Sequence, residues 1–297
     1  MRPTDAATIP HADLGRPTAG RRFEVGDGFS ALSFGRDQFG DRMDPLVMVD
    51  HFTMDTPTFG VHPHAGISAV SVLFEDTEGR FHNRDSLGHD FDLEPGDLYW
   101  LRAGSGIVHD ERPRPGARIH GLQIFVNLPA AEKFDAPGSR LVRAAEVPVL
   151  TGDGARVRVV LGTSNGVSGP PPAAPSGSAA TSLTILDTHL DAGGRFTHSM
   201  PADERAWVLA VDGAGAIEVD GAVVPLVAGE AVTVHPDRPG GDGSPLALRS
   251  EAGAHLVLLQ GRPIGEAIAQ RSGFVMNTEA ELDAVEAAHA AGEFGSL

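Results

Sequence analysis

The sequence predicts an all-β protein, and three observations carry this prediction. From Phe23 onward, short apolar stretches recur that are broken by Gly, Asp and Asn. Several of them alternate apolar and polar residues, which is the period of a half-buried strand. A faint repeat also relates Gly96 to Gly229 at an offset of 133 residues. Many short strands at regular spacing indicate a sandwich or barrel, and a repeat of domain size indicates two copies of it.

Strands and turns alternate clearly in the first half of the chain. The predicted strands are Leu46–Phe52, Ile67–Phe74 and Gly121–Leu128, and two of the turn clusters are Glu75–Gly79 and Glu94–Asp97. In the second half, Leu226–Glu230 and Ala231–Val234 echo Leu93–Asp97 and the strand after it. We therefore expect an N-terminal domain at residues 1–140 and a C-terminal domain at residues 141–297, with Val157–Leu161 as the first strand of the second copy.

Three segments fall outside this strand pattern. Residues Met1–Phe23 are polar and rich in Pro and Gly, which predicts an irregular arm. Gly166–Ala180 is rich in Pro, Ser and Ala, which predicts a mobile loop. Near the C-terminus, Thr278 and Glu281 predict a capping box, with Leu282 and Val285 as the apolar face of a short helix that Gly292 can end.

Two pairs of polar residues carry the chemistry. His62 and His64 are two residues apart, and so are His109 and Glu111. In a strand such residues point to the same face, so two strands would offer two ligands each. A His-x-His pair alone is equally well explained as chance surface histidine. The second pair, placed after a Gly-rich turn and a predicted strand, favours a metal site formed by all four side chains.

Three imidazoles and one carboxylate suit one divalent ion of Fe, Mn, Co, Ni, Cu or Zn. Four protein ligands leave an octahedral ion two open positions, whereas structural sites are usually closed. The ligand set therefore favours a reactive metal over one that only stabilises the fold.

Composition limits the partners. The formal net charge is −17, and no Lys/Arg cluster is visible, so direct contact with nucleic acid or anionic lipid is not expected. The chain has no cysteine, which excludes disulfides and thiol chemistry. We find no signal peptide and no apolar run long enough to span a membrane, so we expect a cytoplasmic location.

With these residues in hand, the chain resembles the pirin family of the cupin superfamily. The segments that carry the resemblance are His62–Gly66, His82–Gly88, Pro95–Glu111, His120–Pro129 and Phe274–Thr278. The resemblance implies a bicupin, in which two jelly-roll β-barrels lie face to face with a short C-terminal helix. It also implies one metal, usually Fe(II), held in the N-terminal barrel by His62, His64, His109 and Glu111.

The resemblance implies no metal in the C-terminal barrel, where His198 and His235 each lack a partner at strand spacing. The family pattern after the first pair is commonly His-Arg-Gly-Phe-Glu, whereas this chain has Ala65, Ile67 and Ser68 at the basic, aromatic and acidic positions. We expect this to remove a charged pair near the mouth of the site.

Some pirins resemble quercetinases, which open the heterocycle of a flavonol with O2. The expected function is therefore a flavonol dioxygenase acting on a small aromatic substrate, with Glu111 as ligand and as the base that takes the flavonol proton. The alternative is a metal- or redox-dependent regulatory protein that binds a transcription factor or a metabolic enzyme. Pirins are often monomeric, and we expect a monomer here.

Other residues near the predicted strands have structural explanations. Hydrogen-bonded structural roles are expected for His51, His82 and His120, and surface positions for His89 and His289. Core packing is expected for Trp100 and Phe125. Gln123 would point into the barrel and line the pocket if its strand keeps period-two alternation.

Overall fold

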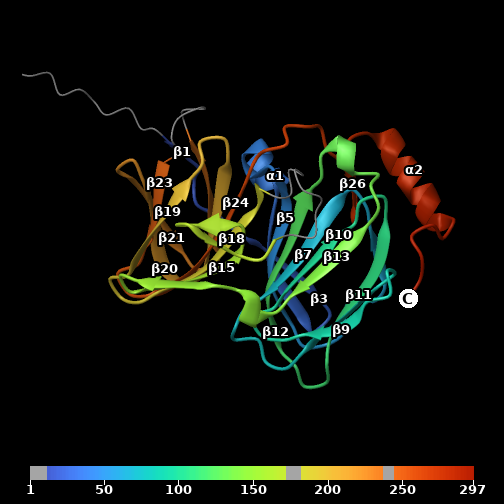
Figure 1. Cartoon of the computed structure of the whole chain (residues 1–297), viewed down its shortest axis with the longest axis horizontal. Helices are drawn as coiled ribbons and strands as arrows, with labels where there is room; N and C mark the ends of the chain where they lie inside the picture. The colour runs from blue at the N-terminus through green and yellow to red at the C-terminus, as the bar shows by residue number, and fades with distance from the viewer. Residues whose placement is uncertain (1–11, 172–181, 237–243) are drawn as a thin grey trace, which may run out of the picture.

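The structure is a computed structural model that describes residues 12–171, 182–236 and 244–297. It is mostly β, which confirms the predicted fold class, and its two β-domains lie side by side (Figure 1). The expected mobile loop lies outside the described residues from 172 to 180, and so do residues 1–11 of the expected arm. Among the described residues, no helix is long and apolar enough to cross a membrane.

The first domain is a barrel of two sheets. In the described part of the chain, its larger sheet has the order β13-β10-β7-β12-β5-β4-β3 and its smaller sheet the order β6-β11-β8-β9. The strands of the larger sheet are β3 (Arg21–Val25), β4 (Phe29–Gly35), β5 (Leu46–Met54), β7 (Ile67–Leu73), β10 (Leu98–Arg102), β12 (Ile119–Asn127) and β13 (Gly138–Val142). Those of the smaller sheet are β6 (His62–His64), β8 (Phe81–Asp85), β9 (Asp90–Leu93) and β11 (Ile107–Pro113).

Short helices complete the first domain. They are α1 (Arg36–Phe39), η1 (Gly40–Met43), η2 (Ala130–Glu132) and η3 (Ala144–Glu146). The domain boundary expected at residues 140 and 141 stays a prediction. Strand β13 spans it and pairs with β10 of the first domain.

The second domain is built on a sheet whose main path is β1-β22-β20-β24-β18-β15-β14 among the described residues. Its strands are β14 (Val149–Gly152), β15 (Ala155–Leu161), β18 (Thr184–Leu190), β19 (Arg195–Met200), β20 (Arg205–Val219), β21 (Ala222–Val227), β22 (Glu230–Pro236), β23 (Ser244–Arg249) and β24 (Ala254–Gly261). Two small hairpins lie apart from it: β16 (Thr163–Ser164) with β17 (Val167–Ser168), and β25 (Ala269–Arg271) with β26 (Phe274–Met276). The long β20 bends from one side of this barrel to the other, pairing with β22 and β24 near its start and with β21 and β23 near its end.

The repeat seen in the sequence is present in the backbone. Gly96 has φ +81° and precedes β10, and Gly229 has φ +83° and precedes β22. Both glycines adopt the left-handed conformation, which other residues rarely take, so the same tight turn introduces a corresponding strand in each domain.

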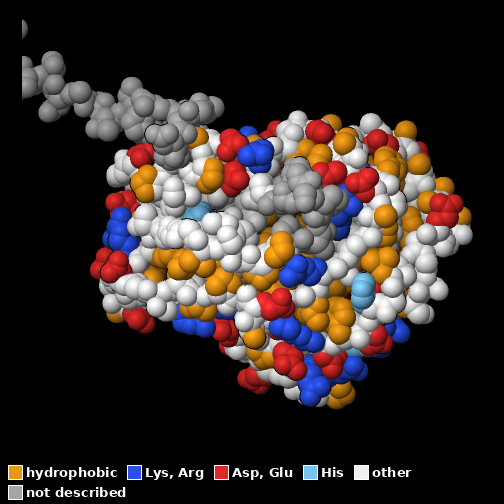
Figure 2. Space-filling view, in the orientation of Figure 1, with side chains coloured by type: hydrophobic (Ala, Val, Ile, Leu, Met, Phe, Trp, Pro, Cys, Tyr) orange, Lys and Arg blue, Asp and Glu red, His pale blue; other side chains and the backbone are white. Residues whose placement is uncertain are grey.

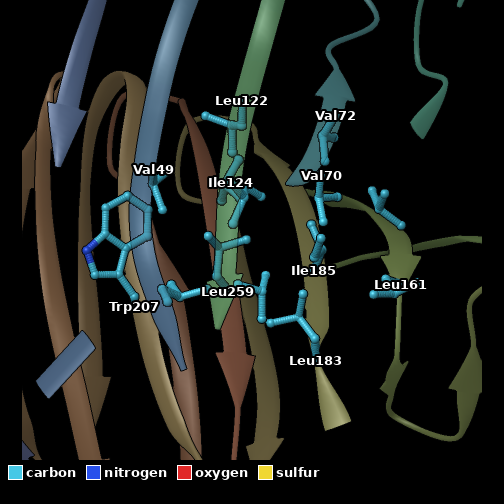
Figure 3. Close-up of a cluster of buried hydrophobic side chains, with 14 of the residues drawn as sticks. Val49, Val70, Val72, Leu122, Ile124, Leu161, Leu183, Ile185, Trp207 and Leu259 are labelled. Atoms are coloured by element: carbon cyan, nitrogen blue, oxygen red, sulfur yellow. The ribbon is translucent and has the colours of Figure 1, made fainter. Parts of the chain in front are cut away.

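An apolar seam joins the two barrels face to face. Its side chains come from the first domain at Val49, Val70, Val72, Leu122 and Ile124 and from the second at Leu161, Leu183, Ile185, Trp207 and Leu259 (Figure 3). Because side chains alternate along a strand, the residues of β7 between these seam positions, such as Ser71, face the interior of the first barrel. One strand therefore builds the domain contact on one face and part of the interior of the first barrel on the other.

The prediction of an irregular N-terminal arm is wrong from residue 12 onward. β1 (Ala12–Leu14) and β2 (Thr18–Ala19) both pair with β22 of the second domain, whereas β3 pairs with β4 of the first. The arm is extended because its backbone groups find partners at the edges of sheets far away in the sequence.

The C-terminal helix is confirmed. Helix α2 (Glu279–Ala290) has the Thr278 and Glu281 capping box, and Leu282 and Val285 are its buried residues. It covers the first domain rather than the second (Figure 1), in a cluster with Ala65, Val108 and Phe274.

Candidate metal centre

Three of the four predicted ligands come together in the first barrel. β11 pairs with β6 in antiparallel register, which places His109 opposite His62 and Ile107 opposite His64. The chain reverses between these strands through β7, β8, β9 and β10, so the pairing is entirely non-local. One ring nitrogen from each of His62, His64 and His109 lies within 4.8 Å of the others, a separation at which a single ion can bind all three.

His109 is the most deeply placed of the three. Its side chain is 1% exposed, and neither ring nitrogen has a hydrogen-bond partner. A buried polar group without a partner is costly, so an imidazole in this position indicates that the ring binds a metal ion. Burial lowers the pKa of His109 well below its usual value, and the charges of His64 and His62 lower it further. The ring is therefore neutral at physiological pH, as metal binding requires.

The other two imidazoles are oriented by backbone carbonyls. The Nδ1 atom of His62 lies 2.8 Å from the carbonyl oxygen of Gly60, and Nδ1 of His64 lies 3.3 Å from that of Gly273. Such contacts leave Nε2 of each ring free to bind a metal. A Cβ atom at residue 273 would lie 2.7 Å from Nδ1 of His64, so this close approach requires glycine.

Glu111 lies in the same pocket but outside the group of three histidines. Its Oε1 atom lies 2.8 Å from Oγ of Ser71, and the same hydroxyl lies 2.8 Å from Oε1 of Gln123. Burial raises the pKa of Glu111 to about 7, against the lowering effect of the Ser71 hydrogen bond. Its role as fourth ligand stays a prediction.

His62 and His64 line an aromatic pocket, and His109 lies against both of their rings. The cavity has a volume of about 260 Å³. Its apolar walls are Phe23, Phe29, Phe52, Phe59, Phe81, Phe125, Met48 and Met54. Gln123 also lines it, as period-two alternation predicted. Phe125 packs against the core of the first barrel, as expected, and its ring also meets His64 edge-on in the pocket with the centroids 5.1 Å apart. Trp100 also packs in the core, at the seam.

Asp50 is a pocket residue that sequence reasoning missed. It is 9% exposed, and its Oδ1 atom has no hydrogen-bond partner. Burial raises its pKa, and a hydrogen bond with Ser33 opposes the rise. The strand register places Ser33, Asp50, Gln123 and Ser71 side by side across four strands. The alternation of Met48, Asp50 and Phe52 within one predicted strand was the signal that could have found it.

The three departures from the family pattern are not at the mouth of the pocket. Ala65, Ile67 and Ser68 are each fully buried, and none of them lines the cavity. Ala65 packs in the cluster beneath α2, and Ile67 packs in the core of the first barrel. We expected these departures to remove a charged pair at the mouth of the pocket. That expectation is wrong about their location, because all three positions are buried away from the pocket.

The remaining histidines of the sequence analysis have other partners. His82 lies 2.8 Å from Asp90, and Nε2 of His51 lies 2.8 Å from Nε2 of His120. In the second domain, His198 contacts Ser164 and Gln260, and His235 contacts the carbonyl oxygen of Arg42. The side chain of His89 is 47% exposed and contacts Asp85, and His289 is exposed on α2.

The sequence matches known families on both domains. The pirin family pattern matches residues 27–126, and that of the pirin C-terminal cupin domain matches residues 185–295. The chain belongs to the pirin family. Pirin from Mus musculus is 32% identical over 253 residues, which cover 84% of this chain and 82% of that one. A pirin-like protein from Caulobacter vibrioides is 33% identical, over 79% of this chain and 82% of that one.

Solved structures share the two-barrel pirin architecture. A quercetin 2,3-dioxygenase from Acinetobacter baumannii superposes with a TM-score of 0.80 at 26% identity, covering 96% of this chain and 97% of that one. This pirin-family chain therefore has the bicupin fold that the resemblance implied. Arginine side chains are interspersed with Asp and Glu over the face in Figure 2, rather than gathered in a stripe.

Proposed function

We propose that this chain is a dioxygenase that depends on one divalent metal and opens the heterocycle of flavonols such as quercetin with O2. The observation that carries the proposal is His109, which is buried, has no hydrogen-bond partner for either ring nitrogen among the described residues, and contacts His62 and His64, two residues that line an aromatic pocket. The related quercetin 2,3-dioxygenase structure supports the same substrate class.

The ligands in this proposal are His62, His64, His109 and Glu111. We favour Fe(II), and Mn(II), Co(II), Ni(II), Cu(II) and Zn(II) suit the same nitrogen and oxygen donors. When bound, such an ion supplies Lewis acidity that makes a flavonol hydroxyl more acidic and the ring more reactive to O2.

Glu111 is suited to take the proton from the flavonol hydroxyl. Burial raises its pKa to about 7 in the metal-free protein, because the charged carboxylate is poorly solvated there, and this environment makes it a stronger base than an exposed glutamate. One hydroxyl hydrogen of Ser71 cannot serve two acceptors. Protonated Glu111 can donate to Ser71, which then donates to Gln123, so this chain accommodates the proton after transfer.

The aromatic walls are suited to position a flat ring system. Phe59 meets Phe29 edge-on with centroids 4.8 Å apart, and Phe23 meets the same ring at 5.9 Å. Phe23 and Phe59 are 42% and 45% exposed, so they form the rim through which a substrate enters. Apolar walls with a few polar groups at the base are typical of small-molecule sites.

The test is oxygen uptake by full-length protein loaded anaerobically with Fe(II), with quercetin and related flavonols. Ring opening adds both atoms of O2 to the flavonol and releases one ring carbon as carbon monoxide, so equal amounts of O2 consumed and CO formed are expected. His62→Ala and Glu111→Ala variants are controls, with metal counted in each. No uptake by protein that holds the metal lost in His62→Ala would reject the dioxygenase and turn attention to a regulatory role with a protein partner.

A further inference from the structure

A second group of histidines lies in a groove at the junction of the two domains. The groove has a volume of about 660 Å³ and is lined from the first domain by Phe74, Glu75, Asp76 and His120, and from the second by Arg156, His189, Val211, Asp212 and His255. It opens at the edge of the apolar seam, on the opposite side of the first sheet from the aromatic pocket. None of its residues belongs to the site described above.

The sheet register brings three of these side chains into a row. His255 on β24 lies opposite His189 on β18 and, on its other side, opposite Asp212 on β20. Directly opposed residues project to the same face, and so does Asp187, which is two residues before His189. The rings of His189 and His255 are stacked with centroids 4.1 Å apart at 17°.

One carboxylate oxygen lies between the two rings' nitrogens. Oδ1 of Asp187 is 2.6 Å from Nε2 of His255 and 3.7 Å from Nε2 of His189, and one ligand atom from each of the three residues lies within 4.8 Å of the others. The other oxygen, Oδ2, accepts a hydrogen bond of 3.1 Å from Arg158. Arg158 therefore fixes the carboxylate while leaving Oδ1 directed at both imidazoles.

The surroundings favour a cation. Four carboxylates, of Glu75, Asp76, Asp187 and Asp212, face or underlie the groove, against the two guanidinium groups of Arg156 and Arg158. Phe74 separates His255 from His120, with ring centroids 4.6 and 4.9 Å away. The groove beside His189 and His255 therefore carries a net negative charge and is open to solvent.

We propose that Asp187, His189 and His255 form a second divalent-metal site at the domain junction, with an open position facing the groove. Two imidazoles and one carboxylate with an open fourth position are a ligand set that suits Zn(II) and its neighbours in the first transition row. The site is independent of the barrel site, since it shares no residue with it.

The test is a count of metal in the full chain. Metal-depleted protein is titrated with Zn(II) by calorimetry, and the ions retained after gel filtration are counted. His189→Ala is the informative variant, because the side chain is 45% exposed and its loss leaves the core intact. His62→Ala removes a ligand of the barrel site, and His289→Ala on the exposed face of α2 is the matched control.

We expect two Zn(II) ions per chain for the wild type and for His289→Ala, one for His189→Ala, one for His62→Ala and none for the double variant. The ion retained by His62→Ala should show nitrogen and oxygen ligands only in its X-ray absorption spectrum, with two imidazoles. One ion in the wild type, unchanged by His189→Ala, would overturn the proposal and leave the dioxygenase proposal untouched. A second ion that survives His189→Ala would also overturn it.

Discussion

His109 lies directly opposite His62 in the antiparallel pair of β11 and β6, with the centroids of the two imidazole rings 4.3 Å apart. Two imidazoles at this distance, one of them without any hydrogen bond, gain little from each other in the metal-free protein. An unpaired buried imidazole lowers the stability of the fold, and a metal ion bound to these rings would offset that cost.

The first prediction is therefore that replacing His109 raises the stability of the metal-free protein and lowers that of the metal-bound protein. His109→Leu removes a buried polar group that has no partner, so the metal-free variant should unfold at a free energy about 1–3 kcal/mol higher than the metal-free wild type. In saturating metal the order should reverse, because only the wild type is stabilised by binding. Denaturant unfolding with and without metal measures both. A less stable metal-free variant would contradict the prediction.

The raised pKa of Glu111 predicts that metal binding releases a proton, to an extent that depends on pH. Its pKa of about 7 in the folded, metal-free protein lies above its usual value of 4.5. Protonated Glu111 is favoured in the folded protein. The stability that it contributes is thus fully present below pH 4.5 and is lost as the pH rises through about 7. If its carboxylate binds the metal, binding at pH 6 should release about one proton and binding at pH 8 almost none.

Calorimetry in buffers of different ionisation enthalpy measures this release. The histidines should contribute little, because burial lowers the pKa of His64 to about 3, that of His109 well below its usual value, and that of His62 as well. Glu111→Gln should abolish the release at pH 6. Its persistence in this variant would assign the proton to another group and remove Glu111 from the ligand set.

Asp50 should matter for turnover but not for metal content. Asp50→Asn keeps the shape of the side chain and removes a titratable group from the pocket wall, so we expect flavonol turnover to fall about 100-fold while the metal content stays that of the wild type. Asp90→Asn, on an exposed carboxylate outside the pocket, is the matched control. Equal turnover in the two variants would show that Asp50 only lines the cavity.

Lys133 should be essential for stability. It is the only lysine of the sequence, it is fully buried, and its Nζ donates to the carbonyl oxygens of Gly66 and Val275 and to Oδ1 of Asn127. Lys133→Met keeps the stem but leaves three buried acceptors unpaired, so the free energy of unfolding should fall by about 3 kcal/mol.

Arg80→Met serves as the comparison for Lys133. The Arg80 side chain is 63% exposed and forms only a surface ion pair with Asp92, so its loss should cost less than about 1 kcal/mol. Similar losses in the two variants, measured by denaturant unfolding, would contradict the special role of Lys133.

Local patterns predicted much of this molecule. Alternation identified β5, β7 and β12, the turn glycines Gly96 and Gly229 identified the repeat, and the capping box identified α2. The pairing of β1 and β2 with β22 was not predictable, because a polar arm shows no sign of the distant sheet edge that orders it. Alternation along β5 could place Asp50 on the pocket face, but its position beside Ser33 and Gln123 depends on the register between strands, which no single segment encodes.

The contact between His64 and Gly273 has a consequence for how the protein is made. Gly273 leaves the ribosome 209 residues after His64, and the β26 strand that follows it carries Val275, which receives the Lys133 hydrogen bond. Residues of the first barrel, which are synthesised early, thus depend on contacts with residues that are synthesised last. In the same way, β1 pairs with β22, which is synthesised much later. Neither half of the gene therefore encodes a barrel that is complete by itself.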